Sequence, residues 1–100
     1  MKIIWSDFAS ETLRDIFQYH KEVAGKHIAH KLKAKIFNST KQLIHHPNSG
    51  KIEKSLKQLG EEHRYLVCRN YKIVYKKVKE GILITDVFDT RQDPIKIQNS

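Results

Sequence analysis

The sequence predicts an α+β domain in which two helices pack on one face of a small antiparallel sheet. Residues 7–44 carry apolar side chains at helical spacing, whereas residues 63–88 are rich in Tyr, Val and Ile and contain two short turns. Helices followed by a run of strands are typical of the α+β class. The expected order is β-α-α-β-β-β. We expect a single domain over residues 1–100, since the chain shows no repeat, low-complexity tract or linker.

The first strand and the first helix are predicted from residues 2–23. Lys2–Trp5 is a short apolar strand that we expect to join the sheet. Ser6 is suited to cap the helix that follows, and the negative charge of Asp7 suits the positive end of its dipole. The apolar residues of this helix recur at i, i+3 and i+4, namely Leu13, Ile16 and Phe17.

The second helix is expected from about Lys26 to Ile44. Gly25 separates it from the first helix, as a turn residue should. Its apolar residues recur every fourth position, and the loop signal Pro47–Gly50 ends it. Residues 51–61 are expected to be irregular, with Leu56 and Leu59 anchoring them to the core. The large aromatic residues expected in the core are Trp5, Phe8, Phe17 and Phe37.

Three strands are predicted in the second half of the chain, at His63–Cys68, Tyr71–Val78 and Ile82–Phe88. The first two are joined by Arg69-Asn70, where Asn tolerates a positive φ. Lys72 and Lys76 alternate with apolar residues, so both should lie on one exposed face of the sheet. Whether that face binds a partner or is merely solvated stays open.

The charge of the chain is strongly basic and unevenly placed. The net charge is +8, and residues 21–57 contribute most of it through nine lysines against Glu22 and Glu53. Such a balance suits nucleic acid or an acidic protein, although a solvated lysine face explains it equally well. The single Cys68 excludes an internal disulfide and fits a reducing compartment. Without a signal peptide or membrane-spanning stretch, we expect a cytoplasmic protein.

The histidines and the cysteine do not form a recognisable metal or nucleophile motif. His27 and His30 have ligand-like spacing on a helix, but no further ligand is evident in the sequence. We therefore interpret the six histidines as surface residues and expect no metal and no cofactor. Cys68 is interpreted as a core or edge-strand residue rather than a nucleophile.

Several short motifs occur in an order that carries family information. A strand followed by Trp5-Ser6 opens the chain, and a lysine-rich helix ends at the Pro47 loop. Then come Arg64-Tyr65-Leu66-Val67, Tyr71-Lys72-Ile73-Val74-Tyr75 and the ending Arg91-Gln92-Asp93-Pro94. In this order and spacing, the chain resembles the RelE/ParE family of bacterial type II toxins. The resemblance implies a cognate antitoxin that folds as it binds, and the basic charge of residues 21–57 favours an acidic one.

The resemblance leaves two targets to be distinguished. RelE-like members cut mRNA on the ribosome, and here Arg64, Lys72 and Arg91 would stabilise the phosphate charge. Lys72 stands where the family usually has Arg, which loses bidentate phosphate geometry, and no Tyr or His follows Tyr75. We therefore favour the ParE-like branch, which inhibits DNA gyrase by protein–protein contact.

In the ParE-like interpretation, the target-binding residues would be Lys72, Arg91 and Asp93. Arg91 also has a simpler explanation, namely local ion pairs with Asp89 and Asp93. A ribosome-dependent mRNA endonuclease remains the alternative, and a non-toxic, basic nucleic-acid-binding module is a further one.

Overall fold

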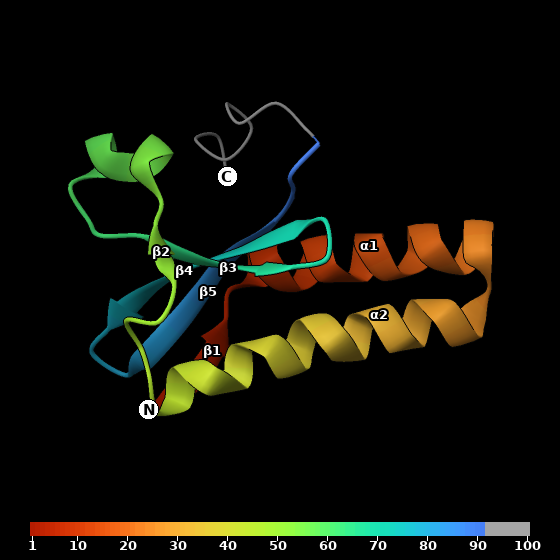
Figure 1. The fold of residues 1–100 in the computed structure, drawn as a ribbon, viewed down its shortest axis with the longest axis horizontal. Helices are drawn as coiled ribbons and strands as arrows, with labels where there is room; N and C mark the ends of the chain where they lie inside the picture. The colour runs from red at the N-terminus through yellow and green to blue at the C-terminus, as the bar shows by residue number, and fades with distance from the viewer. Residues whose placement is uncertain (92–100) are drawn as a thin grey trace.

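The computed structural model describes residues 1–91, which form two helices and a five-stranded sheet. The helices lie side by side on one face of the sheet, and a short 3₁₀ segment lies across the other face (Figure 1). The strands are ordered β1-β5-β4-β3-β2. The elements are β1 (Lys2–Trp5), α1 (Asp7–Ala24), α2 (Lys26–Ser39), η1 (Thr40–Ile44), β2 (Lys51–Ile52), η2 (Lys54–Leu59), β3 (Arg64–Cys68), β4 (Tyr71–Val78) and β5 (Gly81–Asp89).

The predicted three-strand meander is confirmed, but the sheet is mixed rather than wholly antiparallel. β3, β4 and β5 pair antiparallel, whereas β1 joins the edge of β5 in parallel, with Ile3 opposite Ile82. Strands joined by hairpins must be antiparallel, but β1 is separated from β5 by both helices, so no turn fixes its direction. The two-residue strand β2 was not predicted and pairs with the start of β3.

The helical hairpin follows from a cap and a glycine. Ser6 Oγ accepts a hydrogen bond from Ala9 N at 3.0 Å, which confirms the predicted cap of α1. Gly25, with φ of 94°, ends α1 and directly precedes α2. α2 ends at Ser39, and the last five residues of the predicted helix form η1 instead. Ser39 and Thr40 donate their hydroxyls to carbonyls three residues earlier, a contact that competes with the regular helix.

A β-bulge in β5 sets which side chains face the helices. Val74 is opposite Asp86 and Tyr75 is opposite Ile84, so Thr85 is the extra residue of β5. Its hydroxyl donates to Val74 O at 3.3 Å. Because strand residues alternate between faces, the bulge turns both Ile84 and Val87 toward the helices and leaves Phe88 on the opposite face.

The main core lies between the helices and the sheet, and a small second cluster lies on the other face. The prediction of a core position is wrong for two of the aromatic residues, because Phe8 is 46% exposed and Phe37 is 48% exposed. Phe37 instead stacks beside the ring of Trp5 at the surface. The main cluster includes Leu13, Ile36, Leu66, Ile73, Tyr75, Ile82, Ile84 and Val87.

Two further predictions about the loops are corrected. Leu56 is buried against Val74 and Phe88 as predicted, but Leu59 is 53% exposed, because this small apolar patch is already covered by Leu56. In the β3–β4 turn, the positive φ belongs to Arg69, at 57°, rather than to Asn70. A positive φ at the first turn residue alone is the pattern of a type II′ hairpin turn.

Candidate functional site

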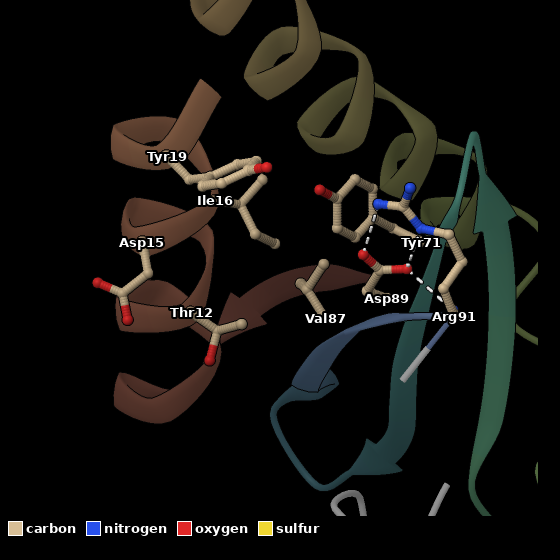
Figure 2. Close-up of a pocket in the computed structure, with 8 residues that line it drawn as sticks. All are labelled: Thr12, Asp15, Ile16, Tyr19, Tyr71, Val87, Asp89 and Arg91. Atoms are coloured by element: carbon tan, nitrogen blue, oxygen red, sulfur yellow. Dashed lines mark hydrogen bonds and ion pairs between the residues drawn. The ribbon is translucent and has the colours of Figure 1, made fainter. Parts of the chain in front are cut away.

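A cleft opens between α1 and the ends of β4 and β5, on the helix-covered side of the sheet (Figure 2). Its volume is about 400 Å³. We call it the α1 cleft. Ile16 and Val87 give it an apolar floor, while Tyr71, Asp89 and Arg91 supply its polar wall. The residues that line it are Thr12, Asp15, Ile16, Tyr19, Tyr71, Val87, Asp89 and Arg91.

Arg91 is fixed at the rim of this cleft by Asp89. Its Nε and Nη2 donate to the two carboxylate oxygens of Asp89 at 3.1 and 2.9 Å, and its backbone N–H donates to the same carboxylate at 2.9 Å. The hydrogen bond from Arg91 lowers the pKa of Asp89, and Asp89 in turn raises the pKa of Arg91. The predicted local ion pair is therefore confirmed for Asp89, whereas Asp93 lies outside the described residues.

Tyr71 forms the wall shared with a second cleft. It is the first residue of β4, is buried, and its hydroxyl lies 3.0 Å from His20 Nε2 on α1. Burial raises the pKa of Tyr71, and the nearby Asp89 carboxylate raises it further. Tyr71 and His20 thus link the sheet to the helical hairpin between the two clefts.

The second cleft, which we call the α2 cleft, is smaller and more basic. Its volume is about 230 Å³. Ile28, Leu32 and Tyr71 line it with apolar surface, and no carboxylate is among its described lining residues. Its cations are Lys31 of α2, Arg69 of the β3–β4 turn and Arg91 after β5, and His20 of α1 also lines it. An apolar floor ringed by cations is suited to an acidic, amphipathic segment.

Arg64, which the RelE-like alternative would place on the phosphate, contacts a loop of its own chain. Its guanidinium donates to Glu62 at 2.9 Å and to the carbonyls of Asn48 and Gly50 at 3.2 and 2.9 Å. Across the β3–β4 ladder it is opposite Tyr75, whose hydroxyl also contacts this loop. The guanidinium of Arg64 therefore helps to hold the loop that follows η1.

Lys72 and Lys76 share one face of β4, as predicted, but each is paired with an acid. Lys72 Nζ lies 3.3 Å from Glu53 Oε1 and 4.2 Å from the centre of the Tyr65 ring. Lys76 forms an ion pair with Glu61, and this contact lowers the pKa of Glu61. Both lysines are about a quarter exposed rather than fully solvated.

The structure does not bring the three proposed phosphate-binding residues together. Side chains alternate along β4, so Lys72 points away from the helices, whereas Tyr71 and Tyr75 point toward them. Arg64 is at the Tyr75 end of the helix-covered side, and Arg91 is at the Tyr71 end. Sequence reasoning missed Tyr71 and His20 as site residues, although Tyr71 opens the quoted strand motif.

The histidine prediction is wrong at one position. His63 is buried, 5% exposed, with its Nδ1 3.2 Å from Glu61 O. The spaced pair on α2 is exposed as expected, with the His30 ring against Phe17. Within residues 1–91, no three His, Cys, Asp or Glu side chains are grouped to hold a metal ion. No helix in this range is long and apolar enough to cross a bilayer.

Comparison with known proteins agrees with this fold. The sequence profile of the ParE toxin of type II toxin–antitoxin systems, parDE, matches residues 3–94. No curated protein sequence gives a significant match. The fold is similar to a solved structure described as the chromosomal ParDE TA system from P. aeruginosa, with a TM-score of 0.75 and 17% identity over 89% of this chain and 95% of that chain. Since the profile covers nearly all of its length, the chain belongs to the ParE toxin family of type II toxin–antitoxin systems.

Proposed function

We propose that this protein is a cytoplasmic toxin that inhibits DNA gyrase by protein–protein contact and is neutralised by a cognate acidic antitoxin. Membership of the ParE family implies the antitoxin. What we propose beyond family membership is that the target is DNA gyrase and that the antitoxin neutralises the toxin by binding it.

The separation of Arg64, Lys72 and Arg91 is the observation that carries the choice of a protein target. Metal-free RNA cleavage needs groups that activate the 2′-hydroxyl, stabilise the phosphate and protonate the leaving oxygen, and all three must converge on one phosphate. Here the three cations lie at different places on the sheet, and each is paired with a carboxylate. This arrangement favours surface contact over catalysis.

Arg91 is the best placed of the proposed target contacts. Its side chain is 69% exposed, yet Asp89 holds its orientation. A fixed and exposed guanidinium loses little side-chain freedom when a partner carboxylate approaches it. Lys72 is less accessible and is the weaker candidate, while Asp93 remains a proposed contact from the sequence.

The two clefts are the proposed seat of the antitoxin. They share Tyr71 and Arg91, and together offer apolar floors with cations concentrated on the α2 side. An antitoxin segment that folds on binding would place apolar side chains on Ile16, Ile28 and Val87 and acidic ones near Lys31 and Arg69.

A supercoiling assay with purified bacterial gyrase tests the proposed target. We expect the wild-type chain to stop supercoiling and to trap gyrase–DNA complexes that break the DNA on denaturation. We expect Arg91→Gln to weaken this inhibition, whereas Arg14→Gln, an exposed arginine on α1, should leave it intact. Unaltered supercoiling at saturating protein would contradict the proposal.

Induction of the chain in cells distinguishes gyrase inhibition from the alternative of mRNA cleavage on the ribosome. If bulk translation stops first and mRNAs are cut within codons, the chain is a ribosome-dependent endonuclease. If DNA synthesis stops while mRNAs stay intact, gyrase inhibition is supported. Co-expression with the cognate acidic antitoxin should restore growth, and failure of any acidic protein encoded upstream or downstream to co-purify would contradict the antitoxin part.

A further inference from the structure

The face of the sheet opposite α1 and α2 has the components of a surface for single-stranded nucleic acid. Lys72 and Lys76 project from β4, and the Tyr65 ring lies beside them on β3, with the Lys72 ammonium 4.2 Å from its centre. Proteins that bind single strands without sequence preference combine cations that follow the phosphates with aromatic rings on which bases stack. This combination was not evident in the sequence, because Tyr65 and Lys72 lie on different strands.

Both lysines on this face are already occupied by carboxylates of the same chain. Glu53 pairs with Lys72 and Glu61 pairs with Lys76. The two acids stand at opposite ends of the segment that carries η2, and Glu53 N donates to His63 O at 2.8 Å, which holds the ends of this segment together. One loop therefore delivers an acid to each cation.

The two ion pairs differ in how easily a phosphate could replace the acid. The Glu53 side chain is 7% exposed, so its pair with Lys72 is shielded from salt and from competing anions. The Glu61 side chain is 55% exposed, and its pair with Lys76 is screened as surface pairs are. A phosphate should therefore displace Glu61 from Lys76 more easily than it displaces Glu53 from Lys72.

We infer that Glu53 and Glu61 act as specificity residues, which exclude single-stranded nucleic acid from the Tyr65–Lys72–Lys76 face. A phosphate that approaches either lysine meets a carboxylate that is already paired with it. The negative charge of that carboxylate repels the phosphate and so disfavours nucleic acid as a partner. A chain of net charge +8 is attracted to any polyanion, so a protein-directed surface gains from such exclusion. The inference holds whichever protein the toxin targets.

Charge-neutral replacements of the two acids provide the test. Glu53→Gln/Glu61→Gln keeps the shape of both side chains and removes two negative charges. The matched control is Glu11→Gln/Glu22→Gln, which makes the same charge change at exposed positions on α1, on the opposite side of the sheet. Binding is measured by fluorescence anisotropy with a labelled oligouridylate of about 12 nucleotides, over a range of salt around 0.15 M.

We expect the Glu53/Glu61 double variant to bind the oligouridylate about tenfold more tightly than wild type and the control. Two new phosphate contacts should also steepen the slope of log K against log salt by about 1.4, at roughly 0.7 per phosphate of a single strand. Adding Lys72→Gln and Lys76→Gln to the double variant should remove the gain.

Two results with the double variant would overturn the inference. One is a double variant that binds no better than its charge-matched control, and the other is a gain that survives the loss of both lysines. If removal of the buried Glu53 charge unfolds the chain, as circular dichroism would reveal, Glu61→Gln alone serves. This variant removes only an exposed carboxylate, and we expect it to bind about threefold more tightly than Glu22→Gln. An absence of that difference also overturns the inference.

Discussion

The hydroxyl of Tyr75 closes the loop between η1 and β2 through two hydrogen bonds. It donates to Pro47 O at 2.8 Å and accepts from Gly50 N at 3.0 Å, while the side chain is only 1% exposed. Burial raises the pKa of Tyr75, so the hydroxyl keeps its proton and remains a donor. The last tyrosine of the strand motif Tyr71–Tyr75 thus holds the loop between η1 and β2 in place.

Replacement of Tyr75 by Phe should measure what this closure contributes. We expect a loss of about 1–3 kcal/mol in the free energy of unfolding, because both loop groups would be left without their partner. Urea unfolding followed by circular dichroism gives the value. Tyr19→Phe, at a hydroxyl on a 59% exposed side chain, is the control and should change stability by less than about 0.5 kcal/mol. Equal effects of the two changes would contradict the role of Tyr75.

The Asp89–Arg91 pair predicts a dependence of stability on acid. The folded pKa of Asp89 is lowered below its ordinary value of 3.8 by the hydrogen bond from Arg91. A lowered pKa stabilises the fold above the unfolded pKa, and this contribution is lost as pH falls through the folded pKa. We therefore expect Asp89→Asn to lose less stability than wild type between about pH 5 and pH 2.

The comparison needs a second carboxylate to remove the effect of net charge. Asp15→Asn changes an exposed acid in the same cleft and should leave the acid dependence as in wild type. The measurement is the urea midpoint at several pH values. A parallel loss of stability in wild type and Asp89→Asn would mean that the Arg91 pair does not persist in solution.

At the scale of elements, the parallel attachment of β1 depends on a close backbone approach at Gly81. Its φ is +147°, and a Cβ there would lie 2.3 Å from Lys2 O. Only glycine permits this contact, which begins the β1–β5 ladder and brings Ser6 N to Ile84 O at 3.0 Å.

Gly81→Ala should therefore release β1 and cost about 2–3 kcal/mol in the free energy of unfolding. Gly60→Ala is the matched change, since Gly60 also has a positive φ, +75°, but an added Cβ would meet no atom within 4 Å. It should cost about 1–2 kcal/mol from the backbone alone. Hydrogen exchange of the β1 amides distinguishes local release from global loss, and protected amides in Gly81→Ala would contradict this account.

Most elements could be predicted because their signals are local. The Ser6 cap, the Gly25 break and the alternation in β4 all lie within a few residues of the structure they specify. The direction of β1 could not be predicted, because strand periodicity does not identify a partner 79 residues later, as in the Lys2–Gly81 pairing. β2 was missed because a two-residue strand has no period to detect.

The site was less predictable than the fold because its contacts are long-range. The Arg91–Asp89 pair spans two residues and was foreseen, whereas Glu53 meets Lys72 across 19 positions and His20 meets Tyr71 across 51. Nothing in the local pattern distinguishes the committed Arg64 from the exposed Arg91. Only the tertiary arrangement shows that one holds a loop and the other lines two clefts.

At the scale of the whole molecule, the basic charge should make stability respond to salt. Lys31 and Lys35 lie four residues apart on α2, where like charges destabilise a helix. We expect the melting temperature to rise between about 0.01 and 0.15 M ionic strength as this repulsion is screened. Lys35→Glu should stabilise the chain by about 0.2–0.5 kcal/mol at low salt and less at high salt. A gain independent of salt would point to helix propensity instead.

The bulge at Thr85 divides β5 into two halves with different surroundings. Both halves contribute to the main core, but only the first half pairs with β1, whereas the second half presents Asp89 and leads to Arg91 at the clefts. The extra residue offsets by one position the alternation of side chains between the two faces of the sheet. Loss of that one residue would therefore turn Asp89 and Val87 to the wrong side together, while the pairing of β1 with the first half of β5 would keep its register.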